Sequence, residues 1–168
     1  MVEQKITILR VGPADKDAFR RIRLEALRSE PAFFASTFDD WDTLPDKAWH
    51  RRLNNPVFIA FLGEEPVALI GLLPEKGSRS AHRATVVMVY VRKSLRGRGI
   101  ASDLFSTVEN YARDIGVTQL ELTVSAENSV AIGFYLREGF IEIGRIPGGF
   151  IYKSKEIDEV LMARRLPV

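Results

Sequence analysis

The chain has 168 residues, 46% of them apolar and none of them cysteine. A chain of this size can build one self-supporting core, and the lack of cysteine excludes disulfides, thiolate nucleophiles and cysteine-based metal sites. Its 24 basic and 22 acidic side chains give a net charge of +2, which is too small to predict wholesale binding to nucleic acid or to a membrane.

No linker or internal repeat divides the chain, so we expect a single domain over residues 1–168. The longest apolar run, residues 84–91, falls far short of the roughly 20 residues that a membrane-spanning helix needs. Residues 1–10 lack the basic and apolar segments of an export signal, so a cytoplasmic location is expected. The number of subunits stays open between a monomer and a homodimer.

The start of the chain predicts a strand followed by a helix. Ile6 and Ile8 lie in an alternating pattern that is typical of a short strand. Gly12, Pro13 and Asp15 form a turn that can cap the helix after it. The apolar stripe of that helix consists of Ala18, Phe19, Ile22, Leu24, Ala26 and Leu27. The solvated face is expected to hold Arg20, Arg21, Arg23 and Arg28.

The rest of the chain mixes strands and helices. A second short helix is expected to begin at Pro45. Strands are expected at residues 57–62, 67–73, 84–91, 120–124, 142–145 and 158–166, the first three as an antiparallel meander. Helical spacing from Ile100 to Gly116 and from Asn128 to Gly139 predicts two helices that each end in glycine. This order is that of a mixed α/β (α+β) domain.

A glycine-rich loop at residues 91–101 joins a buried strand to an amphipathic helix, where backbone N–H groups can converge on an anion. Gly97 and Gly99 lack the Cβ atoms that would keep a phosphate away, and Arg96 and Arg98 supply positive charge. The alternative is a plain strand-to-helix turn with exposed arginines. The loop lacks the third glycine of a dinucleotide-binding fingerprint, and no Gly-Lys pair completes a P-loop.

Two stretches form a more specific pattern: Arg-Gly-x-Gly-Ile-Ala at residues 96–101 and Asn-x-x-Ala-x-x-x-Tyr-x-x-x-Gly-Phe at residues 128–140. In this order they resemble the GNAT superfamily of acetyl-CoA-dependent N-acetyltransferases, and the resemblance covers nearly the whole chain. It implies a central mixed, mostly antiparallel sheet with helices on both faces, splayed between residues 85–91 and 120–124. It also implies acetyl-CoA as cosubstrate, no metal, and acetyl transfer to a primary amine of a small molecule or peptide by direct attack through a tetrahedral intermediate.

The same resemblance assigns cofactor contacts. It implies that main-chain groups of Val89 and Val91 pair with the pantetheine arm like an added strand. Tyr135 stands where the family usually places a tyrosine that donates to the coenzyme sulfur, although spacing alone favours core packing beside Phe134. The implied cofactor-binding residues are Val89, Tyr90, Val91, Arg96, Gly97, Arg98, Gly99, Ile100, Ala101, Asn128, Ala131 and Tyr135.

This sequence differs from the family pattern at the positions where many relatives carry a carboxylate that acts as general base. Residues 85–91 contain no acidic side chain, and Thr123 occupies one of the familiar positions. Glu121, on the same strand face as Thr123, is the candidate base, with an exposed surface glutamate as the alternative. Glu127 is expected to be solvated, and His82 is expected to be an exposed loop residue despite its suitable ordinary pKa.

The acceptor pocket is expected from residues 31–41 and 147–155, which lie outside the cofactor motifs. The candidate acceptor-binding residues are Phe33, Ser36, Thr37 and Asp40. Acidic and hydroxyl side chains beside aromatic rings suit a cationic amine, through direct pairing and cation–π attraction. The alternative is that these aromatic residues only pack the core.

A second hypothesis is a binding module, either a catalytically silent acyl-CoA-binding domain or an RNA-binding domain. RNA binding would use Arg92, Lys93, Arg96 and Arg98 around Tyr90. Four cations on one loop suffice for weak nonspecific phosphate affinity, but the stacking aromatic residues of a single-strand binder are missing. We therefore expect no nucleic-acid partner and no membrane partner.

Overall fold

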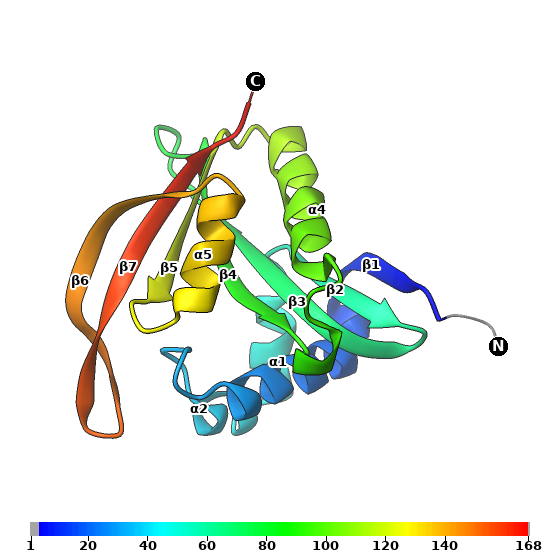
Figure 1. Cartoon of the computed structure of the whole chain (residues 1–168). Helices are drawn as coiled ribbons and strands as arrows, with labels where there is room; N and C mark the ends of the chain where they lie inside the picture. Colours follow the sequence, from blue (N-terminus) through cyan, green and yellow to red (C-terminus); the bar gives the residue numbers. More distant parts are fainter. Residues whose placement is uncertain (1–3, 168) are drawn as a thin grey trace.

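One sheet organises residues 4–167, which the computed structural model describes, and its seven strands follow the order β1-β2-β3-β4-β5-β7-β6 (Figure 1). The strands are β1 (Ile6–Val11), β2 (Val57–Leu62), β3 (Glu65–Pro74), β4 (Arg83–Val91), β5 (Gln119–Ser125), β6 (Ile141–Tyr152) and β7 (Lys155–Arg165). Every neighbouring pair is antiparallel except β4 and β5, which are parallel. The predicted mixed, mostly antiparallel sheet is confirmed.

Helices cover both faces of this sheet (Figure 1). They are α1 (Lys16–Ser29), α2 (Phe38–Asp42), α3 (Asp46–Arg52), α4 (Ile100–Asp114) and α5 (Ser129–Arg137), with short 3₁₀ turns at Pro13–Asp15 and Lys93–Leu95. Leu69 of β3 packs into the core formed with α1, α2 and α3, whereas its neighbours Ala68 and Ile70 pack into the core formed with α4 and α5. Within residues 4–167, no helix is both long enough and apolar enough to cross a bilayer.

The predicted inward stripe of α1 is buried as expected at Phe19, Ile22, Ala26 and Leu27. The solvated position predicted for Arg23 is wrong, because its side chain is only 4% exposed. Its guanidinium carbon lies 4.4 Å from the ring centroid of Trp41 and 5.1 Å from that of Phe34. Burial, and then the nearby charge of Arg52, lowers the pKa of Arg23 to about 10. Periodicity cannot reveal this contact, because the rings come from α2 and the loop before it.

The strands β6 and β7 form a long hairpin arm at one end of the sheet (Figure 1). Both strands are longer than the sequence predicts, so residues 147–155, expected as a loop, are mostly strand. The pairing register slips between Ile146 and Phe150, where a proline and two glycines interrupt the strand pattern. Lys153 and Ser154, both with positive φ, make the tight turn at the tip.

The strands β4 and β5 diverge soon after they pair. Their parallel pairing covers only residues 83–85 against residues 119–121. Beyond these three pairs, β5 continues alongside β7, whereas β4 continues alongside β3. This geometry confirms the splayed sheet, and the opening between the two strands positions the site.

A β-bulge reshapes β4 where it faces this opening. The pairing register of β3 and β4 slips before Gly71, so Met88 and Val89 together face Ile70. Met88 has φ of +58°, in the left-handed region that side chains rarely adopt. A Cβ on Gly71 would lie 2.6 Å from Met88 Cε and 2.9 Å from a methyl of Val87. A side chain at position 71 would therefore force Met88 or Val87 to shift, and glycine avoids this contact.

Candidate active site

The divergence of β4 and β5 opens a cleft of about 670 Å³, a size typical of small-molecule sites. Residues 86–91 of β4 form one wall, and the end of β5 with α5 forms another. The loop before α4, the first turn of α4 and residues 30–34 after α1 complete the lining. The cleft therefore brings together segments that are distant in sequence and that the two motifs only partly contain.

The glycine loop turns into α4 with both glycines in the left-handed region. Gly97 has φ of +78° and Gly99, the N-cap residue of α4, has φ of +80°. A Cβ on either residue would meet no atom within 4 Å, so glycine is required by the backbone conformation and leaves open space for a ligand. The first N–H groups of a helix have no partner within the helix. The start of α4 can therefore receive a pyrophosphate.

The side chain of Arg96 is committed to the protein itself. Its Nε donates to the carbonyl oxygen of Val91 at 2.9 Å, and its terminal nitrogen forms an ion pair with Glu30. Arg98 is exposed and does not line the cleft. Arg137, which the sequence analysis did not select, lines the cleft from α5. The expectation that Arg96 and Arg98 supply free charge to a phosphate is therefore not supported by their positions.

Most of the residues predicted to bind the cofactor line this one cleft. They are Val89, Tyr90, Val91, Arg96, Gly97, Gly99, Ile100, Ala101, Asn128, Ala131 and Tyr135. Asn128 has a local role, since its side-chain oxygen accepts from the N–H of Ala131 at 3.2 Å and caps α5. The hydroxyl of Tyr90 donates to Glu25 of α1 at 2.9 Å, so this side chain anchors β4 to α1.

Tyr135 both lines the cleft and packs in an aromatic cluster. Its ring lies 5.7 to 5.9 Å from the rings of Phe105, Phe134 and Phe140, and the residue is buried. Burial, and then the negative charge of Glu30, raises the pKa of Tyr135 above its ordinary value. The hydroxyl therefore stays protonated at neutral pH and can donate a hydrogen bond. Among the hydrogen bonds of residues 4–167, none uses this hydroxyl as donor.

The position of Glu121 does not support the prediction that it is the general base. Its two carboxylate oxygens bind Arg83, with distances of 2.5 Å to Nε and 2.6 Å to a terminal nitrogen. Gln119 donates to the same carboxylate at 2.9 Å. Hydrogen bonds from Arg83 are the main reason that the pKa of Glu121 is lowered. The carboxylate does not line the cleft, so it joins β4 to β5 at their paired end.

The acceptor candidates separate into two groups. Phe33 lines the cleft, whereas Ser36, Thr37 and Asp40 do not. Thr37 and Asp40 cap α2: the N–H of Asp40 donates to the Thr37 hydroxyl at 3.1 Å, and the N–H of Thr37 donates to the Asp40 carboxylate at 2.8 Å. These hydrogen bonds lower the pKa of Asp40. The structure therefore places these three polar residues outside the cleft, and their predicted contact with the acceptor has no support from their positions.

The aromatic rings of this segment are also occupied by the chain's own cations. Arg28 lies 4.6 Å from the ring centroid of Phe38, and Arg52 lies 4.1 Å from that of Trp41. Arg23 covers Phe34 and the same Trp41. Cation–π attraction at these rings therefore helps to hold α1, α2 and α3 together.

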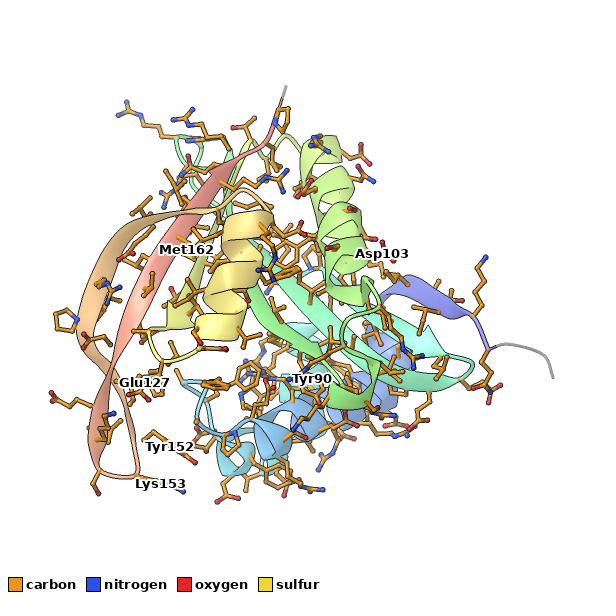
Figure 2. The ribbon with its side chains drawn as sticks, viewed as in Figure 1. Tyr90, Asp103, Glu127, Tyr152, Lys153 and Met162 are labelled. Carbon is orange, nitrogen blue, oxygen red and sulfur yellow. The ribbon has the colours of Figure 1, made fainter. Side chains whose placement is uncertain are left out.

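Sequence reasoning missed two cleft-lining carboxylates, Glu30 and Glu127. Glu30 follows the last residue of α1, and no pattern marked it. Glu127 was expected to be solvated, and its side chain is indeed half exposed, with its carboxylate 2.5 Å from Lys155 Nζ. Figure 2 shows Glu127 on the loop before α5, above Tyr152 and Lys153 at the tip of the hairpin arm.

The chain matches the family model described as the acetyltransferase (GNAT) family over residues 19–140. The chain therefore belongs to the GNAT family of acetyltransferases. The fold agrees with this assignment: the acetyltransferase of the GNAT family from Streptococcus pneumoniae superimposes with a TM-score of 0.84 at 22% identity, covering 97% of this chain and 100% of that one. The structure of yncA from Salmonella typhimurium with its cofactor acetyl-CoA superimposes with a TM-score of 0.78 at 18% identity, covering 98% of this chain and 95% of that one.

Two characterised relatives match part of the chain. N-acetyltransferase 8B of Rattus norvegicus is 35% identical over 89 residues, which cover 52% of this chain and 40% of that protein. Thialysine N-epsilon-acetyltransferase of Caenorhabditis elegans is 28% identical over 96 residues, which cover 57% of this chain and 60% of that protein. The chain thus spans about half the length of these relatives.

Proposed function

We propose that this protein transfers the acetyl group of acetyl-CoA to a primary amine of a small molecule or peptide. The observation that carries the proposal is the cleft that is lined both by the loop before α4 and by Tyr135. The loop before α4 suits a pyrophosphate, and the hydroxyl of Tyr135 suits the sulfur of the departing coenzyme. Family membership over residues 19–140 supports the same reaction.

Binding of acetyl-CoA would use the main chain more than charged side chains. N–H groups at the start of α4 would face the pyrophosphate, because Gly97 and Gly99 leave open space there. The β4 wall, Val89 to Val91, would take the pantetheine arm as an added strand. The bulge at Met88 frees β4 from regular pairing with β3 at the same place, so N–H groups of β4 would be available for the oxyanion of a tetrahedral intermediate.

The proposed reaction is direct attack of the amine on the thioester carbonyl. The chain has no cysteine, so a thiol-based acyl-enzyme is excluded. When the C–S bond breaks, its electron pair stays on the coenzyme sulfur. The raised pKa of Tyr135 makes complete proton transfer from tyrosine unfavourable, so its hydroxyl would stabilise the thiolate by donating a hydrogen bond.

RNA binding has less support than acetyl transfer. Arg92, one of its four proposed cations, is held by Glu25 at 2.7 Å and by Glu65 at 3.0 Å. Arg96 is held by Glu30. Internal ion pairs therefore engage half of the proposed RNA-binding cations.

A panel of amines tests the proposed function. Purified protein is mixed with acetyl-CoA and with thialysine, spermidine, an aminoglycoside or a peptide with a free N-terminus, and released thiol is recorded. We expect saturable thiol release with at least one amine. Binding of acetyl-CoA without thiol release above the protein-free rate for any amine would favour the catalytically silent acyl-CoA-binding module.

A further inference from the structure

The proposed reaction needs a group that removes a proton from the acceptor. An alkyl ammonium with an ordinary pKa near 10.4 is neutral in only about one molecule in 10³ at pH 7. Glu121 lies outside the cleft, and Thr123, which lines it, cannot act as a base at neutral pH. Glu30 and Glu127 are the carboxylates that line the cleft within residues 4–167.

The backbone of Glu30 is fixed where α1 ends. Its N–H donates to the carbonyl of Ala26 at 3.0 Å, and its own carbonyl accepts from the N–H of Phe33 at 3.1 Å. The side chain is 21% exposed, so it is largely desolvated yet open to the cleft. Phe33 and Phe34 line the cleft directly after it. This carboxylate therefore stands where the loop after α1 meets the cofactor side of the cleft.

An arginine holds one oxygen of this carboxylate. The terminal nitrogen of Arg96 contacts Glu30 Oε1, while Arg96 Nε donates to the Val91 carbonyl at 2.9 Å. Among the hydrogen bonds of residues 4–167, none engages Glu30 Oε2. One oxygen is thus positioned by the loop that precedes α4, and the other is free to accept from a ligand.

Glu30 also interacts electrostatically with Tyr135, the proposed hydrogen-bond donor to the coenzyme sulfur. Burial is the main reason that the pKa of Tyr135 is raised, and Glu30 is the one charged group within residues 4–167 that adds to this shift. The charged and titratable side chains that interact with Glu30 are Arg96 of the loop, through the ion pair, and Tyr90 of β4 and Tyr135 of α5, through the effect of the Glu30 charge on their pKa values. Glu127, by contrast, is half exposed and is paired with Lys155 of the hairpin arm.

We propose that Glu30, held by Arg96, is the general base that accepts the proton of the acceptor ammonium; this inference rests on the proposed function. The ammonium gives one proton to Glu30 Oε2, and the nitrogen lone pair forms the C–N bond. The C–S bond breaks with its electrons on sulfur, and a second nitrogen proton passes to the thiolate with the Tyr135 hydroxyl as hydrogen-bond donor. Glu30 then releases its proton to water, so each turnover yields one amide, one thiol and one proton.

The test compares Glu30→Gln with the wild-type protein from pH 6.5 to 9.5, with the fastest amine of the panel as acceptor. We expect kcat/KM to fall about 100-fold at pH 7, in the range typical of general-base catalysis. The ratio of wild-type to variant kcat/KM should become at least tenfold smaller by pH 9.5, because far more of the acceptor amine is then neutral without a general base. A purely structural role would lower activity by the same factor at every pH.

Two further variants are measured beside Glu30→Gln. Asp42→Asn is the matched control, since it also removes a carboxylate paired with an arginine, Arg20 at 2.8 Å, outside the cleft. We expect it to keep wild-type activity at every pH. Glu30→Asp keeps the charge but withdraws it by one methylene, and should recover part of the lost rate with the wild-type pH profile. It also replaces Glu30→Gln as the test if that variant does not fold.

Each outcome decides between the alternatives. Glu30→Gln with wild-type kcat/KM at pH 7 would overturn the assignment while leaving acetyl transfer in place. If Glu127→Gln, and not Glu30→Gln, shows the pH-dependent loss of kcat/KM, the general base is Glu127 and the assignment of Glu30 is overturned. Absence of thiol release by the wild-type protein with every amine would contradict the proposed function, and this inference with it.

Discussion

Arg96 and Glu30 form an ion pair that joins the loop before α4 to the end of α1. Both residues line the cleft, so the segment expected to bind a pyrophosphate and the segment that we propose lies next to the acceptor are physically connected. A change at the cofactor loop can therefore reach the acceptor side of the cleft through one contact. This arrangement underlies the predictions that follow.

Acetyl-CoA should stabilise the folded protein. A ligand that binds only the folded state at 100 times its Kd adds roughly 2.7 kcal/mol, which corresponds to an increase of several degrees in Tm for a domain of this size. Thermal unfolding with increasing acetyl-CoA, together with calorimetric titration, measures the effect. An unchanged Tm and no heat at millimolar acetyl-CoA would contradict the assignment of the cleft.

Gly99→Ala should weaken acetyl-CoA binding tenfold or more. The new Cβ would enter the open space at the start of α4 and would also strain a residue with φ of +80°. Gly116→Ala is a matched control, because Gly116 has φ of +84°, equally open surroundings and no place in the cleft. Both variants should lose roughly 1 kcal/mol of folding stability. If both bind acetyl-CoA as tightly as wild type does, the loop is not the phosphate site.

Tyr135→Phe should lower kcat roughly 10- to 100-fold and leave acetyl-CoA affinity nearly unchanged. The ring keeps its packing against Phe105 and Phe140, whereas the sulfur loses its hydrogen-bond donor. Tyr111→Phe, outside the cleft, controls for loss of a hydroxyl. Wild-type turnover in Tyr135→Phe, with the chemical step shown to limit the rate, would reduce Tyr135 to a packing residue.

Glu121→Gln should affect stability and not catalysis. The folded-state pKa of Glu121 is lowered, so its contribution is present above the unfolded pKa and is lost as pH falls through the folded pKa. For a partly exposed pair we expect roughly 0.5–1 kcal/mol. The Tm difference from wild type should therefore be largest near pH 7 and should disappear once the pH is below the folded-state pKa, and kcat at neutral pH should equal that of wild type. A large loss of kcat at neutral pH would return Glu121 to the list of candidate bases.

The sequence predicts the parts of this molecule that depend on local geometry. Gly97 and Gly99 have the left-handed conformations that their loop requires, and Asn128 caps α5 as its spacing indicates. The features that it misses are contacts between distant segments. Arg83 of β4 reaches Glu121 of β5, and Arg96 of the loop before α4 reaches Glu30 at the end of α1.

Two other features escape sequence patterns for a different reason. Met88 sits in an ordinary apolar strand pattern, and its positive φ arises from the register slip opposite Gly71. Arg23 lies where helical periodicity indicates a solvated face, but aromatic rings from another segment cover it. Both depend on how neighbouring elements pack, which no single segment encodes.

The most direct test of the account follows the acetyl group itself through a single turnover. Protein is mixed in excess over acetyl-CoA labelled with ¹³C in its acetyl group, together with the best amine of the panel, and quenched at successive times for mass spectrometry. The account predicts that labelled amide and free thiol appear at the same rate, with no labelled protein at any time. Labelled protein that forms before the amide and decays as the amide appears would contradict direct transfer in this cleft.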